Sequence, residues 1–207
     1  MKGLLLKDWY VLWKLGKLYF VMMLAFLFFS LSQSGYFYVC FIAVLMAMLP
    51  ITALSMDERS KWHIYAAALP YSPATIVAEK YVLGLIFVLA PMVLRVAAGA
   101  VYGAVSGTPQ DLLLPAFLML IAGFAPMAVN YPIVFKFGTE NGRVAYLIFI
   151  VIFSAAVSAS YVVLRDVDMS FLDRLPGVPV ALVPVGSLLL TALSMLLSIQ
   201  IYKKKEF

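Results

Sequence analysis

Charged residues are scarce in this sequence. Only 12 % of its 207 residues are Asp, Glu, Lys or Arg, whereas a soluble domain carries about 25 %. At the same time, 65 % of the residues are hydrophobic and the mean hydropathy is +1.02. A chain of this composition cannot cover a surface that faces water. We therefore expect an integral membrane protein with one membrane domain and no second, soluble module.

The side chains that build catalytic and metal sites are equally rare. Cys40 is the single cysteine, which excludes a disulfide within the chain. His63 is the single histidine and has no cysteine near it, so a zinc site would lack ligands. It also cannot serve as the base for a serine inside an apolar stretch. We expect no catalytic residue and no bound metal in this chain, and we do not expect it to be an enzyme.

Two further classes of ligand are excluded by missing motifs. The sequence contains no Gly-x-x-x-x-Gly-Lys-Ser/Thr phosphate loop, so we expect no ATP or other cofactor bound by this chain. Its lysines and arginines do not gather into a basic face with stacking or base-reading groups. We therefore expect no nucleic-acid partner.

What the sequence does contain is a series of long apolar stretches. A helix needs about 20 apolar residues to cross the hydrocarbon core, and most of these stretches are long enough. The first is short and would gain length from the snorkelling stems of Lys14 and Lys17. We predict an all-α membrane protein, with six transmembrane helices in a domain over residues 18–207. The six stretches are Leu18–Leu31, Phe37–Met56, Ile76–Tyr102, Leu112–Phe135, Val144–Leu164 and Ala181–Ile201.

The placement of positive charge predicts the orientation. With the N-terminus inside, all but three of the 15 lysines and arginines lie in inner segments, the exceptions being Arg95, Arg165 and Arg174. Cytoplasmic loops carry an excess of lysine and arginine, so the reverse orientation would oppose this rule. We expect a multi-pass protein of the bacterial cell membrane with both termini in the cytoplasm.

Lysines interrupt residues 1–17, so we do not predict that this segment spans the membrane. Wound as a helix, they place Trp9 and Trp13 on one face with Leu5 and Leu12, and Lys7 and Lys14 on the other. Tryptophan at headgroup level and lysine near anionic lipid are typical of an interfacial amphipathic helix. The segment is either an ordinary juxtamembrane anchor or an elbow helix connected to a gate.

The longest polar stretch follows the second apolar run. Asp57 is a candidate N-cap, Trp62, Tyr65 and Leu69 follow a helical stripe, and Pro70 would end that helix. Ser72 and Pro73 are typical of the N-cap and first position of the next span. A short helix of this kind can dock into a groove on a soluble partner, or its aromatic residues can anchor at the inner interface.

Three polar residues lie in or beside the spans. Arg95 lies in the outer half of the third span, and we expect it to snorkel outward or to pair with an outer aspartate. The alternative is that it binds an acidic group of a cargo. Asn130 could hydrogen-bond between helices, and Gln200 stands beside the closing lysines, where it could contact headgroups. All three are candidates for lining a cargo path.

The whole arrangement resembles the permease subunits of ABC-2-type ATP-binding-cassette transporters. The resemblance rests on the opening residues 1–10, on an Asp-Glu-x-Ser-x-Trp segment followed by Leu-Pro, and on Lys136-Phe137-Gly138. It implies that residues 57–72 form a cytosolic coupling helix that contacts the ATPase. The coupling residues would be Asp57, Glu58, Arg59, Ser60, Lys61, Trp62, Tyr65, Leu69 and Pro70.

The resemblance also implies partners and a function. The sequence is most similar to small permeases that export phenol-soluble modulins or antimicrobial peptides. It therefore implies a separate ABC ATPase that binds ATP and Mg, a second permease, identical or homologous, and membrane lipid. The cargo would be an amphipathic peptide or a lipid-like molecule, moved out of the cell. The alternatives are a membrane anchor or sensor that recruits a cytosolic partner without transport, and an intramembrane enzyme.

Overall fold

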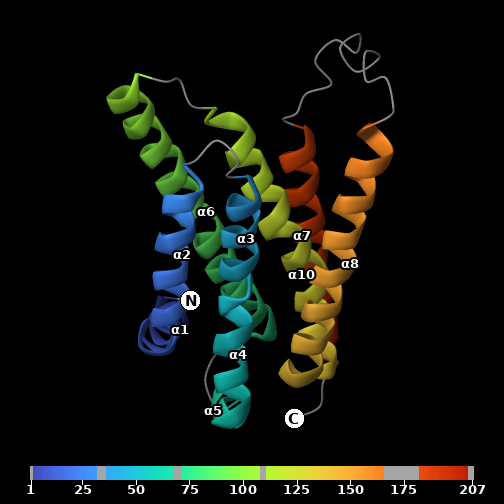
Figure 1. The fold of residues 1–207 in the computed structure, drawn as a ribbon. Coiled ribbons are helices and arrows are strands. Elements are labelled where there is room, and N and C mark those ends of the chain that lie inside the picture. Colours follow the sequence, from blue (N-terminus) through green and yellow to red (C-terminus); the bar gives the residue numbers. More distant parts are fainter. Residues whose placement is uncertain (1, 32–35, 68–70, 108–110, 166–181, 205–207) are drawn as a thin grey trace.

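The computed structural model describes residues 2–31, 36–67, 71–107, 111–165 and 182–204, and this part is helical with short connections and no strand. The helices run side by side in one bundle (Figure 1), with α5, the junction of α7 and α8, and the end of α10 at one end. We call this the α5 end. The helices are α1 (Lys2–Leu15), α2 (Lys17–Phe29), α3 (Tyr36–Ala47), α4 (Leu49–Arg59), α5 (Trp62–Ala67), α6 (Pro73–Ser106), α7 (Leu113–Phe137), α8 (Thr139–Arg165) and α10 (Leu182–Lys203).

In the described part of the chain, four helical segments are long and apolar enough to cross a membrane. They are Tyr36–Arg59, Pro73–Ser106, Leu113–Phe137 and Val185–Lys203. The α1–α2 pair would give a fifth if counted as one broken span, but the two helices are bent by 75° relative to each other. The prediction of an all-helical, multi-pass protein is thus confirmed. The count of six spans and the orientation stay predictions.

The second predicted span has a one-residue break at Met48, between α3 and α4, although the two helices together form one span. Pro50 lacks an N–H group, and the N–H of Met48 donates to the carbonyl of Leu45, 3.2 Å away, rather than to that of Val44. Two tyrosines from other helices use carbonyls beside the break. Tyr146 of α8 donates to Val44 O at 2.5 Å, and Tyr131 of α7 donates to the next turn of α3. The break between α3 and α4 is therefore held by α7 and α8.

Two buried clusters form the interior. One joins α1, α2, α3, α4, α6 and α7, and the other joins α3, α4, α6, α7, α8 and α10. Close approach of α6 and α7 depends on glycine: a Cβ at Gly84 would lie 2.5 Å from Met127, and one at Gly123 would lie 2.5 Å from Val88. Large apolar residues elsewhere are exposed, as suits faces that meet lipid.

The helix ends confirm one capping prediction and correct another. Ser72 is the N-cap of α6, and its hydroxyl accepts from the N–H of Thr75 at 3.2 Å. The prediction that Asp57 caps a helix is wrong, because α4 continues to Arg59 and places Asp57 in its last turns. The carboxylate of Asp57 is engaged elsewhere, by two lysines.

Candidate functional site

A cluster of charged residues lies where α1, α4 and α6 meet near the α5 end. We call Lys7, Asp8, Asp57, Glu79 and Lys80 the ionic cluster. Lys80 of α6 is 3 % exposed and lies between two carboxylates. It contacts Asp8 of α1, which is 1 % exposed, and its Nζ lies 2.8 Å from Asp57 Oδ2. The cluster therefore joins three helices through groups that are largely hidden from solvent.

Lys7 connects the same cluster to α5. Its Nζ lies 2.5 Å from Asp57 Oδ1, 3.1 Å from Asp8 Oδ1 and 4.5 Å from the centroid of the Trp62 ring. A cation over an aromatic face is attracted by the ring quadrupole. The predicted elbow helix is thus attached to both sides of the predicted coupling segment, by an ion pair to α4 and a cation–π contact to α5.

The electrostatics of the cluster make its members mutually dependent. Buried charges are expensive unless they are paired and hydrogen-bonded. Burial alone would raise the pKa of Asp8, but the nearby ammonium groups of Lys80 and Lys7 outweigh burial, so this pKa lies below its ordinary value. Glu79 is also buried; its Oε2 lies 3.5 Å from Lys80 Nζ, and its Oε1 has no hydrogen-bond partner. Losing Lys80 would leave Lys7 as the one cation beside Asp8 and Asp57 and would remove the ion pair of Glu79.

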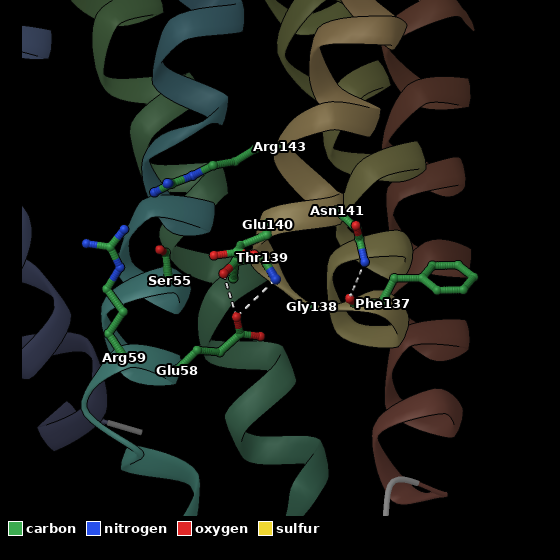
Figure 2. Close-up of a pocket in the computed structure, with 9 residues that line it drawn as sticks. All are labelled: Ser55, Glu58, Arg59, Phe137, Gly138, Thr139, Glu140, Asn141 and Arg143. Carbon is green, nitrogen blue, oxygen red and sulfur yellow. Dashed lines mark hydrogen bonds between the residues drawn. The ribbon is translucent and has the colours of Figure 1, made fainter.

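Glu58 joins the end of α4 to the start of α8. Its Oε2 accepts from the backbone N–H of Thr139 at 3.0 Å and from the Thr139 hydroxyl at 2.5 Å (Figure 2). An acidic group at a helix N-terminus satisfies free N–H groups and complements the helix dipole. Gly138 makes the turn between α7 and α8 with φ +84, a conformation that favours glycine. Glu58 and Gly138, which belong to two separate segments that carry the family resemblance, therefore lie side by side here.

A cavity of about 350 Å³ opens at this junction. Figure 2 shows its lining side chains, which come from α4 on one side and from the α7–α8 junction on the other. The lining is polar and carries both signs of charge, so it can receive a polar or charged side chain. The lining residues are Ser55, Glu58, Arg59, Phe137, Gly138, Thr139, Glu140, Asn141 and Arg143.

The predicted coupling residues divide into two groups. Asp57, Glu58 and Trp62 contact other parts of the chain, as described above, and Trp62 is half-buried rather than exposed. Tyr65, in contrast, is 65 % exposed. We call the exposed residues the outward surface: Arg59, Ser60, Lys61 and Tyr65. Leu69 and Pro70 lie outside the described residues.

The elbow residues also differ in part from the amphipathic prediction. The face of α1 that packs into the molecule carries Leu4, Asp8 and Leu12, all buried. Trp9 and Trp13 are exposed and stack on each other, with ring centroids 6.2 Å apart. Lys14 is exposed and Lys7 is not, because it points into the ionic cluster. A helical wheel does not show that a charged side chain, Asp8, lies on the buried face of α1.

The three candidates for a cargo path lie apart from this site. Gln200 is exposed on α10. Asn130 is buried, but its Nδ2 donates to Pro126 O of its own helix at 3.1 Å, and its Oδ1 has no partner, so it forms no bond between helices. Arg95 is 3 % exposed, and its Nη2 donates to the carbonyl of Ser30 at 3.1 Å. In this conformation Arg95 is buried and does not extend to a surface. Asp111, an outer aspartate in the predicted topology, acts on it electrostatically without forming an ion pair, and the role of Arg95 stays a prediction.

Sequence reasoning missed several residues of the site. Asp8, Glu79 and Thr139 were not singled out, and Lys80 was counted only as an inner-face charge. A signal was present: Lys7-Asp8 and Glu79-Lys80 are neighbouring opposite charges within largely apolar surroundings. Charged residues in or near a span tend to pair with one another. Two such pairs predict an ionic contact, although the sequence alone does not say between which helices.

One comparison with known proteins gives a match over nearly the whole chain. The chain matches the model of the family described as ABC-2 family transporter protein over residues 3–203. No curated protein and no solved structure matches the chain. Within the described residues, no group of three or more His, Cys, Asp or Glu side chains could hold a metal ion.

Proposed function

Since the chain belongs to the ABC-2 family of transporter proteins, we propose that this transporter permease subunit works in an exporter whose ATP is hydrolysed by a separate ABC ATPase. The ATPase binds ATP and Mg and docks on the outward surface at the end of α4. A second permease, identical or homologous, completes the membrane part. The cargo is an amphipathic or hydrophobic molecule, in the first place a peptide, moved out of a bacterial cell.

One observation carries this proposal: residues next to and within the outward surface contact the helices behind it. Asp57 and Glu58 immediately precede the outward surface, and Trp62 lies within the same segment. Their partners belong to α1, α6 and α8. A displacement imposed on Arg59–Tyr65 would therefore reach three other helices without first deforming a flexible loop. A surface used only for recruitment would not need such connections.

The fold supports a route for that displacement. When ATP binding closes the ATPase pair, the docked end of α4 would be pushed or turned. The break at Met48–Pro50 allows α4 to move relative to α3, because the regular helical bonding is interrupted there. Tyr146 and Tyr131 hold this break and would change partners as α4 moves. Hinges of this kind lie at element ends and absorb changes in backbone angle.

The cargo class is supported by the chemistry of the spans. Few charged groups lie along the candidate spans away from the α5 end, Arg95 being the exception among the described residues. A path between two such permeases would be lined by apolar and aromatic side chains, which suits an amphipathic cargo better than a hydrated ion. Membrane lipid covers the remaining apolar faces.

The test compares two exposed tyrosines that lie toward opposite ends of the helical bundle. Tyr65 lies on the outward surface, and Tyr102 lies near the far end of α6. The permease is co-expressed with its proposed ABC ATPase partner, and the complex is purified by capturing the permease. Tyr65→Ala should weaken ATPase capture by about tenfold or more, since truncating an interface aromatic can cost about 2 kcal/mol. Tyr102→Ala should leave capture unchanged.

The same preparation separates transport from recruitment. In proteoliposomes, the wild-type complex should show ATP-dependent accumulation of a labelled amphipathic peptide, and Tyr65→Ala should lose it. Capture of the ATPase without ATP-dependent movement of any amphipathic peptide or lipid analogue would support the anchor or sensor. No loss of either capture or transport in Tyr65→Ala would contradict the proposed docking surface.

A further inference from the structure

Arg95 is a buried cation that makes no ion pair with the described residues; the carboxylate of Asp111 acts on it electrostatically, but its Oδ1 accepts from the N–H groups of Leu113 and Leu114. Among the described residues, every ion pair belongs to the ionic cluster, and none includes Arg95. Its Nη2 donates to Ser30 O, but Nε and Nη1 have no hydrogen-bond partner. These two atoms carry three of the five N–H donors of a guanidinium group. The side chain is therefore charged, hidden from solvent and largely unsatisfied.

The surroundings are shaped to hold the guanidinium in this position. Gly99 lies one helical turn after Arg95 on α6, and a Cβ there would lie 2.5 Å from Arg95 Nη1 and 2.9 Å from Leu112. Glycine at 99 thus leaves room for the guanidinium. Ser30 is the C-cap of α2, so its carbonyl carries only the partial negative charge of a helix end. It orients the arginine but does not neutralise it.

We propose that Arg95 is a binding site for one anionic group, a carboxylate or a phosphate, carried by an amphiphile. A planar fork of N–H donors matches the oxygens of either group, and an uncompensated arginine in apolar surroundings gains from such a partner. The site lies on α6, fifteen residues and roughly 22 Å beyond Lys80, away from the α5 end. The bond to Ser30 holds the arginine in the closed conformation, and the anion enters when α2 and the start of α7 separate from α6.

Two sources share this chemistry, a lipid headgroup and an acidic cargo. The full-length chain in neutral detergent is titrated with lysophosphatidylglycerol, with dodecanoate and with uncharged dodecyl glucoside. The wild type should prefer at least one anionic probe over the glucoside by about tenfold. Preference for the phosphate probe assigns the site to lipid, and preference for the carboxylate assigns it to an acidic cargo. Equal affinity for all three probes overturns the proposal.

Variants test whether Arg95 causes the preference. Arg95→Gln should abolish it, and Arg95→Lys should retain only part of it because the planar fork is lost. Gly99→Ala should weaken it by displacing the guanidinium while keeping the charge. Gly186→Ala is the matched control, because a Cβ there meets nothing within 4 Å. An unchanged preference in either Arg95→Gln or Gly99→Ala overturns the proposal.

Arg95→Met distinguishes binding from a purely structural role. An unpaired buried charge does not stabilise the fold, so this variant should melt at or above the wild-type temperature while losing the anion preference. If Arg95 serves only to anchor Ser30, Arg95→Met would melt earlier and keep the preference, which would overturn the proposal. Neither measurement requires the ATPase, so the result is independent of the proposed docking surface.

Discussion

Lys80 offers the sharpest test of the ionic cluster, because its loss leaves Lys7 as the one cation beside Asp8 and Asp57 and removes the ion pair of Glu79. Lys80→Met keeps the length and apolar stem of the side chain and removes only the charge. Breaking a buried ion pair by removing one partner costs about 3–5 kcal/mol. In Lys80→Met, Lys7 would be the one remaining cation for the carboxylates of both Asp8 and Asp57. For a chain of this size, 1 kcal/mol shifts Tm by about 2–4 °C. We therefore expect Lys80→Met to lower Tm by roughly 6–20 °C.

The assay is thermal unfolding of the purified permease in detergent, followed by helical circular dichroism. Lys203→Met is the control, because Lys203 is an exposed lysine near the end of α10. This variant should have a Tm within about 2 °C of the wild-type value. The decisive variant combines Lys80→Met with Asp8→Asn and Asp57→Asn, which removes the excess negative charge around Lys7 and should recover most of the loss. A Lys80→Met variant as stable as Lys203→Met, or a triple variant no better than the single one, would refute the electrostatic account.

Three further predictions concern other contacts. Thr139→Ala should lower the free energy of unfolding by about 1 kcal/mol, because it weakens the cap on α8. Adding Glu58→Gln to this variant should lower it little further, which a double-mutant cycle in thermal unfolding measures. Fully additive losses would contradict the contact. Tyr146→Phe should destabilise the chain by about 0.5–1.5 kcal/mol by removing its bond at the α3–α4 break, and an unchanged Tm would argue against that bond. On a background without the native cysteine, a cysteine at Ser106 should react with an impermeant thiol reagent added to intact cells and one at Lys61 should not; the reverse pattern would invert the predicted orientation.

The sequence predicted the parts of the fold that depend on local pattern. Apolar length predicted the helices, and Ser72-Pro73 predicted the start of α6, because capping is determined by residues next to one another. The sequence did not predict the break in the second span. A proline near the middle of an apolar run, such as Pro50, is compatible both with a continuous helix and with an interrupted one. The carbonyls beside the break accept hydrogen bonds from Tyr131 and Tyr146, which come from two other helices and cannot be inferred from the local sequence.

The candidate site was predicted in position but not in its contacts. The segment from Asp57 was singled out, yet its mixed charges were interpreted as facing a partner. The partners of Asp57 lie 50 and 23 residues away in the sequence, at Lys7 and Lys80. A rule that counts lysines by side of the membrane cannot distinguish an exposed lysine from a buried, paired one. For the same reason the rule could not show that Arg95 is covered by α2 and the start of α7.

The most direct test of the central claim, that the outward surface docks the ATPase, is site-specific photocrosslinking in the intact complex. A photoreactive amino acid replaces Tyr65 in one strain and Tyr102 in another, and both strains also express the proposed ATPase partner. The account predicts a crosslink to the ATPase from position 65 and none from position 102, with the yield at position 65 changing when ATP is trapped. A crosslink from position 102, or none from position 65 in a complex that still transports, would contradict it.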